Sequence, residues 1–302
     1  MARTKAAFKP SLSDRVFDIA NFTIMALVMI VTLYPFLNVL AISLNDSVDT
    51  VRGGIYIWPR EFTLDNYVQI FKYDGLVTGA KNTILRTLAG TFLGLLSGTM
   101  LGYVLSRVDF QGRKFMSTFL ALTMYFSGGM IPVFILIRDL NMMNSFLVYI
   151  IPGMVSAFNV FVIRSFIDSL PYSLQESAKL DGANDFTIYY KIILPLCKPV
   201  LATIALFLAV GQWNSWLDTY LYNGNAPHLT TLQFELMKVL QSTQGQTSGM
   251  MTGQNMAEIV KQVSPESIKM AITIVVTVPI LLVYPFLQRY FVKGMTLGAV
   301  KS

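Results

Sequence analysis

The sequence is short of charge, cysteine and histidine. Of its 302 residues, 13% are charged and 54% are hydrophobic, which leaves too few charges to cover a soluble globule of this size. The only cysteine is Cys197 and the only histidine is His228, so neither an internal disulfide nor a His/Cys metal cluster can form. These shortages predict a membrane protein without a metal site, in which Cys197 fills the core and His228 lies in a loop.

Motifs that would supply chemistry or energy are also missing. No glycine is followed by a lysine and a hydroxyl residue, so the phosphate-binding loop of ATPases is absent. The scattered acids and the single histidine form no acid–base set of the kind that an enzyme uses. Arg86, Arg138, Arg164 and Asp218 lie near the ends of predicted helices, where such charges reach the headgroups. An enzyme and an ion-coupled carrier are therefore both disfavoured, and energy for uphill transport must come from another subunit.

Long apolar runs are what the chain has in abundance. Six of them are long enough to cross about 30 Å of hydrocarbon as helices of roughly 20 residues each. Most of the 23 Lys and Arg residues fall in the two tails and in the second and fourth connections, and cytoplasmic segments carry such an excess. This bias predicts that both termini are cytoplasmic, and it explains the net charge of +6 without nucleic-acid binding. The predicted spans cover residues 17–40, 84–105, 115–137, 146–166, 199–217 and 268–290.

One membrane domain, over residues 17–291, is predicted between cytoplasmic tails of residues 1–16 and 292–302. Two excursions leave the membrane on the outer face, at about 45–81 and 218–269. The second contains a Gly, Ser, Thr and Gln-rich stretch that is typical of a flexible segment. The sequence leaves open whether this loop is passive or contacts a partner, although about fifty residues is long for a connection.

The stretch ESAKLDGANDFTIYYKIILPLCKP, residues 176–199, is unusually polar for this chain. Ser173 and Glu176 have the spacing of a capping box, which predicts the start of a short helix on the cytoplasmic face. Gly182 is expected to end that helix in the left-handed conformation, and Asn184 or the aspartate after it to cap a second helix. The stretch therefore predicts a rigid helical projection on the cytoplasmic side.

The spacing within this stretch resembles a known motif. It reads E-S-A-x-x-x-G-A, and nine residues separate Gly182 from I-x-L-P at 192–195. This closely resembles the coupling loop in permease subunits of binding-protein-dependent ABC importers, whose pattern is E-A-A-x-x-x-G, nine residues and I-x-L-P. Ser177 departs from the pattern but is still small. Further stretches that resemble the six-span sugar permeases of the maltose type are FTLDNYVQIF (62–71), KNTI (81–84), GQWNSW (211–216) and LQRYFVKGMTLGAVKS (287–302).

The resemblance implies an all-α, type I ABC importer permease fold with six transmembrane helices and a coupling loop at about 170–199. In that family the short helix docks in a cleft of the ATP-binding subunit, and the C-terminal tail can reach between two such subunits. The residues implied in docking are Glu176, Ser177, Ala178, Asp181, Gly182 and Ala183. The residues implied in the tail contact are Gly294, Thr296, Gly298, Val300 and Lys301.

The resemblance also implies the partners and the mechanism. The chain and a second homologous permease would form a pore in the bacterial cytoplasmic membrane and alternate access to it. An extracytoplasmic solute-binding protein would deliver a carbohydrate, and two copies of an ATP-binding subunit would bind ATP and Mg, which leaves this chain without a cofactor. The branch that the sequence resembles is associated with larger oligosaccharides from complex polysaccharides, including acidic ones.

Candidate solute contacts follow from the chemistry of sugars, which stack on aromatic faces and bind polar side chains. Each kind of candidate residue named below has a structural alternative that stays open. The aromatic candidates can instead form an interfacial belt, and the asparagine candidates can bond between helices. The alternative function is an ion-coupled secondary carrier or channel for small polar solutes. The candidate residues are Trp213, Asn214, Trp216 and Tyr220 around the fifth span, with Tyr125 and Asn159 as helpers from spans three and four.

Overall fold

The structure, a computed structural model, describes residues 11–244 and 265–299, and most of them are helical. The chain divides into two compact units. The first comprises residues 1–70 and 253–274, and the second comprises residues 71–252 and 275–302. Helix α15, Pro265–Ala299, contributes to both units.

The first unit contains α1 (Leu12–Ser43), α2 (Ser47–Thr50) and most of α3 (Asp65–Phe71). Helix α1 is apolar on all sides, and its side chains are almost entirely exposed in the isolated chain. A helix that is hydrophobic all round suits lipid rather than water. The helix is therefore built to span a membrane.

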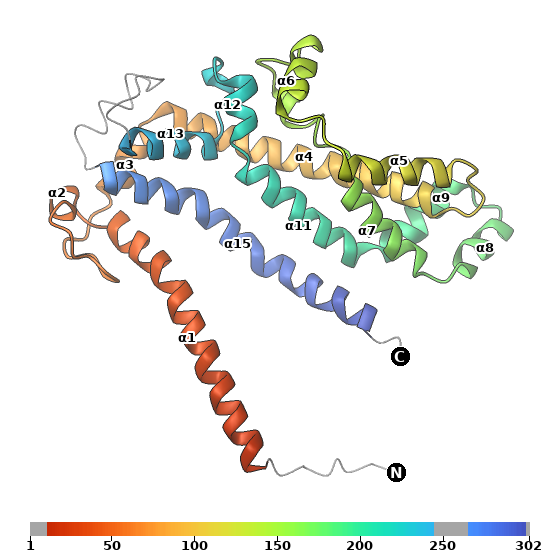
Figure 1. Ribbon diagram of the computed structural model, residues 1–302, viewed down its shortest axis with the longest axis horizontal. Coiled ribbons are helices and arrows are strands. Elements are labelled where there is room, and N and C mark those ends of the chain that lie inside the picture. The colour runs from red at the N-terminus through yellow and green to blue at the C-terminus, as the bar shows by residue number, and fades with distance from the viewer. Residues whose placement is uncertain (1–10, 245–264, 300–302) are drawn as a thin grey trace. The chain divides into compact units, whose positions relative to one another are not determined.

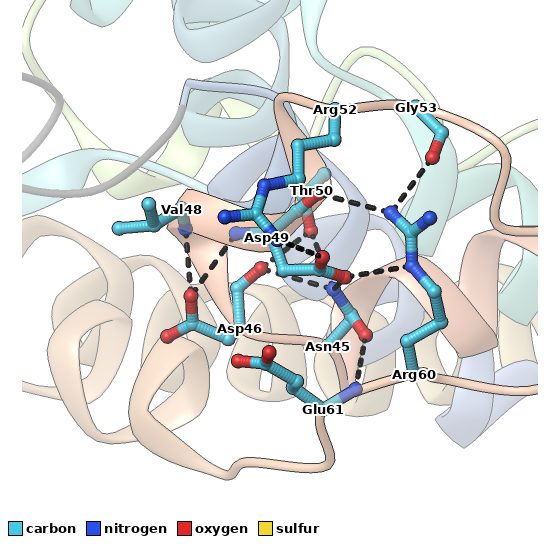
Figure 2. Close-up of polar contacts among 9 residues, drawn as sticks. All are labelled: Asn45, Asp46, Val48, Asp49, Thr50, Arg52, Gly53, Arg60 and Glu61. Atoms are coloured by element: carbon cyan, nitrogen blue, oxygen red, sulfur yellow. Dashed lines mark hydrogen bonds and ion pairs between the residues drawn. The ribbon is translucent and has the colours of Figure 1, made fainter.

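The first predicted excursion is held by a cluster of polar residues next to α2, shown in Figure 2. The fully buried Asn45 donates to Asp49 Oδ2 at 3.0 Å, and Arg60 Nε donates to the same oxygen at 2.9 Å. Asp46 caps α2 by accepting from the amides of Val48 and Asp49. The hydrogen bond from Asn45, which has the largest effect, and those from Arg60 lower the pKa of Asp49. This part of the excursion is therefore an ordered, hydrogen-bonded segment rather than an irregular loop.

The second unit is built around α4, Asp74–Ser106. Figure 1 shows α4 beside α7 (Ala157–Asp168) and α11 (Lys198–Asn214), and it also packs against α13 (Leu232–Gln244). Glycines on α4 allow this close approach: a Cβ at Gly102 would lie 2.9 Å from Ile163 Cγ2. The remaining elements are α5 (Arg113–Tyr125), α6 (Met130–Asp139), η1 (Phe146–Tyr149), α8 (Ser173–Leu180), α9 (Asp185–Ile188), η2 (Tyr189–Ile193), α10 (Leu194–Leu196), α12 (Leu217–Asn223) and η3 (Pro227–Leu229).

Among the described residues, three helical segments are long and apolar enough to cross a membrane: Leu12–Ser43, Asp74–Ser106 and Glu266–Val283. Two bent pairs could each make one more span. One pair, Arg113–Tyr125 and Met130–Asp139, is bent by 118°. The other pair, Asp185–Leu196 and Lys198–Asn214, is bent by 80°. The helical composition is confirmed, whereas the count of six is not.

Two of the predicted spans are wrong as single helices. The run at 115–137 is broken where Gly129 takes a φ of +83°, a conformation that interrupts a helix. The run at 146–166 divides into η1, turns and α7, and Pro152 followed by Gly153 lies between the two helices. A proline removes a backbone donor and the following glycine weakens the helix further.

Candidate functional site

The predicted cytoplasmic projection is present as α8 and α9. Gly182 has a φ of +81° and donates to Lys179 O at 3.0 Å, and Ala183 donates to Ala178 O at 2.9 Å. This pair of bonds is a Schellman motif, so the predicted end of the helix is confirmed. Asn184 Oδ1 accepts from the amide of Thr187 at 2.8 Å and caps α9, as predicted.

The helix predicted to start at SLQESAKL is present as α8, but its predicted capping box is wrong. Ser173 is already the first helical residue, and Tyr172 occupies the capping position. Among the described residues, no side chain donates or accepts a capping bond there, so the Ser173–Glu176 capping box does not form. The spacing alone was misleading because Pro171 and Tyr172 already turn the chain into the helix.

The implied docking residues do not all face outward. Ala178 is buried in the core beneath α8, and Ala183 packs against that core. The apolar Leu180 and Phe186 are 90% and 69% exposed and were not selected from the sequence. A leucine in the last turn of a predicted polar helix, two positions before Gly182, is the sequence signal that could have found this apolar tip. The implied docking residues that are exposed are Glu176, Ser177, Asp181 and Gly182.

Arg107, directly after the end of α4, ties the projection to that helix. Its guanidinium donates to Gln175 Oε1 of α8 at 2.7 Å and lies 3.2 Å from Asp185 Oδ1 of α9. It also donates to Asp109, which accepts from Lys179 Nζ of α8 at 3.1 Å. The hydrogen bonds from Arg107, which have the largest effect, and the one from Lys179 lower the pKa of Asp109 to about 2. One buried cation thus connects α4 with both helices of the projection.

An apolar core lies beneath the same projection. Ile188, Tyr189 and Ile193 of α9 and η2 pack with residues of α7 and with Cys197, which is 2% exposed. The Tyr189 hydroxyl bonds to Thr99 of α4 at 2.7 Å. The prediction that Cys197 fills the core is confirmed. The projection is fixed to α4 and α7 by packing as well as by charge.

A buried ion pair joins α4 to the start of α12, and the sequence analysis missed it. The Arg86 side chain is 2% exposed and that of Asp218 is 20% exposed. The two are joined by paired hydrogen bonds, one of them at 3.1 Å. Arg86 Nε also donates to Gln212 Oε1 at 3.0 Å, and the guanidinium lies 4.4 Å from the centre of the Tyr149 ring. The expectation that these charges reach headgroups is wrong, because the chain breaks after α11 and returns Asp218 to Arg86.

A cavity of about 300 Å³ lies beside this ion pair, within the second unit. One side carries charged and polar groups, and the other carries aromatic and aliphatic side chains. The residues that line it are Arg86, Val133, Ile137, Val148, Tyr149, Pro152, Gly153, Phe207, Leu208, Gly211, Gln212, Ser215, Asp218 and Tyr222.

The candidate solute contacts are all described, and none of the six lines this cavity. Trp213 Nε1 donates to the Val276 carbonyl of α15 at 3.0 Å. The rings of Trp216 and Tyr220 lie 6.3 Å apart, and Tyr220 is 55% exposed. The remaining three are dispersed: Tyr125 at the end of α5, Asn214 at the end of α11 and the buried Asn159 in α7.

The implied tail contact is only partly within the described chain. Gly294, Thr296 and Gly298 belong to the helical backbone of α15. Val300 and Lys301 lie outside the described residues. The stretch of the second excursion that is predicted to be flexible also lies outside them, from residue 245 to residue 264.

The family of the chain follows from comparison with known proteins. Residues 90–297 match the family described as binding-protein-dependent transport system inner membrane component. The chain belongs to this family. It is 35% identical to the polygalacturonan/rhamnogalacturonan transport system permease protein YtcP of Bacillus subtilis, over 96% of this chain and 100% of that protein. It is 31% identical to the arabinooligosaccharides transport system permease protein AraQ of Halalkalibacterium halodurans, over 92% and 94%.

Solved structures agree with this assignment. The chain resembles a chain of a bacterial ABC transporter involved in the import of the acidic polysaccharide alginate, with a TM-score of 0.83 and 30% identity. The match covers 93% of this chain and 98% of that one. A second structure, a bacterial alginate ABC transporter in complex with a pentasaccharide-bound periplasmic protein, has a TM-score of 0.57 and 15% identity and supports the fold.

Proposed function

We propose that the chain is the membrane permease subunit of an ATP-driven importer for oligosaccharides. The observation that carries the proposal is the helical projection, in which an exposed short helix is fixed to α4 and α7 by Arg107 and by an apolar core. A projection of this kind can transmit force, because a docked partner that displaces α8 also displaces α4.

The proposed mechanism divides the work between this chain and its partners. Two ATP-binding subunits carry ATP and Mg, one of them docks on the exposed face of α8, and this chain needs no cofactor. A second homologous permease completes the pore, and an extracytoplasmic binding protein delivers the solute. In this arrangement the chain has six spans with both termini cytoplasmic: the three long helices, the two bent helix pairs as broken spans, and η1 with α7 as a sixth, also broken, span.

The proposed solutes are oligosaccharides because relatives are described as permeases for polygalacturonan or rhamnogalacturonan and for arabinooligosaccharides. A carrier that works alone is the competing function. The buried Arg86–Asp218 pair supplies an intramembrane charge, but its two charges are already matched to each other, so it is not an evident ion relay.

Co-purification tests the proposal directly. The chain is tagged in its native membrane and extracted gently, and the proteins that accompany it are identified by mass spectrometry. We expect a second permease and an ATP-binding subunit at comparable levels. Recovery of the chain alone, under conditions that preserve other such complexes, would reopen the carrier hypothesis.

Gly182→Val tests the role of the projection. No described atom lies within 4 Å of a Cβ built at Gly182, so valine meets no steric obstacle, but it is strained at a φ of +81°. We expect import to be lost while the chain stays in the membrane. Gly53→Val is the matched control, because Gly53 also has a positive φ, +68°, and open space at its Cβ, but lies outside the projection. Wild-type import by the Gly182 variant would contradict the coupling role.

A further inference from the structure

We propose that Tyr56, Ile57 and Trp58 form a membrane anchor, which inserts into the headgroup–acyl boundary of the lipid leaflet at the C-terminal end of α1. The three residues are called the anchor below, and all of them belong to the first unit. The proposal goes beyond the proposed function, because it needs only that α1 spans a membrane. The evidence is the exposure of the three side chains, the hydrogen bonds that hold their backbone to α1, and the depth at which those bonds lie.

The anchor side chains project from a segment whose two ends are held. They are 65%, 56% and 82% exposed in chain order, whereas Ile55 and Pro59 on either side are buried. Arg60 closes the segment by donating to Asp49 Oδ2 at 2.9 Å and to Gly53 O at 2.8 Å (Figure 2). Tryptophan is highly buried on average, and neighbouring exposed apolar groups on an ordered segment mark a contact surface. The segment therefore suits a partner rather than water.

Asn38 holds this segment against the side of α1. Its amide nitrogen donates to the carbonyls of Ile55 and Tyr56, each at 2.8 Å. Asn38 lies five residues before Ser43, the last residue of α1, so the segment folds back by about 7.5 Å along the helix. Backbone carbonyls that enter a membrane need such a donor, because lipid offers none. The contact places the anchor beside the helix rather than beyond its end.

The position of Asn38 along α1 gives the depth of the anchor. Asn38 follows Asp18 by 20 residues, and no residue between the two is charged. At 1.5 Å per residue this separation is about 30 Å, which matches the hydrocarbon thickness of a bilayer. With Asp18 kept at one boundary by its charge, Asn38 lies at the other. Trp and Tyr concentrate at this level, where the ring lies in an apolar layer and its polar atom reaches water.

Lipid fits this surface better than a soluble protein does. The anchor adjoins a part of α1 whose own side chains, among them Tyr34, Phe36 and Leu40, are exposed and apolar or aromatic. It therefore continues a surface that already suits lipid. A soluble partner approaches from the water and would meet charged groups such as Arg52, which is 72% exposed, before it met groups at the level of Asn38.

The experiment places a nitroxide spin label at the anchor. The chain, with the proteins that co-purify with it, is reconstituted into nanodiscs of phosphatidylethanolamine and phosphatidylglycerol. Collisions of the label with oxygen, which concentrates in the bilayer, and with a nickel chelate, which stays in water, are measured. We expect the oxygen-to-nickel ratio of labelled Trp58→Cys to be about threefold higher than that of Arg52→Cys, the aqueous control on the same excursion. Background from this chain is small, because Cys197 is its only cysteine and is 2% exposed.

Three results would overturn the anchor. Equal ratios in Trp58→Cys and Arg52→Cys would place the segment in water. A label shielded from both oxygen and nickel would assign the segment to a contact with another subunit. Shielding that develops only when the extracytoplasmic binding protein is added would assign it to docking of that protein. None of these results bears on the importer proposal, which co-purification tests separately.

Asn38→Leu, combined with the label at position 58, tests the hydrogen bonds that place the anchor. Leucine is similar in size and suits a membrane helix, but it leaves the two carbonyls of the segment without their donor. We expect the label to become about twofold more accessible to nickel, because unpaired carbonyls move toward water. Thr32→Leu is the matched control, since Thr32 Oγ1 donates inside α1, to the carbonyl of Val28 at 2.8 Å. Equal nickel accessibility in both variants would overturn the placement by Asn38.

Discussion

Two buried arginines, Arg86 and Arg107, show how differently the same side chain is used at two places along α4. Both are almost fully buried, and both lie near a tyrosine ring. Arg86 has one carboxylate, Asp218, whose side chain is 20% exposed, whereas the carboxylates of Arg107, Asp109 and Asp185, are 55% and 65% exposed. Water reaches the carboxylates of Arg107 but reaches that of Arg86 poorly. Both arginines are fixed in place, Arg107 also by the buried Gln175, but only the ion pairs of Arg107 are open to solvent.

Breaking the Arg86 pair has the largest expected effect. Asp218→Ala leaves a buried guanidinium without its anion, and the cost of such a change is about 3–5 kcal/mol. We expect the melting temperature of the detergent-solubilised chain to fall strongly. The double variant Arg86→Met, Asp218→Leu removes both charges and should recover most of the loss, without restoring import. A single variant as stable as the natural chain would show that the pair is solvated.

The surroundings of the two arginines also show which features of the structure can be predicted from the sequence and which cannot. Gly182 and Asn184 were predicted correctly because a left-handed turn and a helix cap are set by neighbouring residues. The Arg86–Asp218 pair joins residues 132 positions apart, and nothing local to either residue indicates the other. The repeated apolar runs predicted helices, but their breaks depend on short Gly and Pro segments whose effect is decided by packing. The cavity, which such long-range contacts form, was therefore not predictable.

Removing Arg107 has an intermediate expected effect. Arg107→Gln takes the donor away from Gln175 and Asp109, and a lost hydrogen bond to a charged group costs about 1.5–3 kcal/mol. We expect the complete transporter to keep its basal ATP hydrolysis and lose most of the stimulation by the binding protein. Arg107→Lys, which keeps the charge, should recover part of the stimulation. The control is Arg138→Gln, because Arg138 and its partner Asp139 are both 59% exposed.

Equal losses of basal and stimulated hydrolysis in Arg107→Gln would indicate that the residue only maintains the fold. Selective loss of stimulation would indicate that the residue positions α8 for transmission. Rescue by Arg107→Lys separates these outcomes further, because a lysine restores the charge but not the planar set of donors that reaches Gln175 and Asp185 together.

The smallest expected effect is a pH dependence carried by Asp109. Its pKa is lowered to about 2 by Arg107 and then by Lys179, below the value of about 3.9 for an unfolded chain. The ionised carboxylate therefore contributes stability above about pH 4, and this contribution is lost as the pH falls toward 2. Because the side chain is 55% exposed, water screens the interaction and the shift in melting temperature should be small.

Asp109→Asn sharpens the measurement, since it removes the titrating group and keeps the shape. Between pH 5 and pH 3 the natural chain should lose slightly more thermal stability than Asp109→Asn, and the two should respond alike between pH 6 and pH 8. An identical acid response of both chains would mean that water screens the interaction of the Asp109 carboxylate so fully that it contributes no stability. Arg107 would then hold α8 and α9 through Gln175 and Asp185 alone, and its cluster would depend less on charge than the pair at Arg86 does.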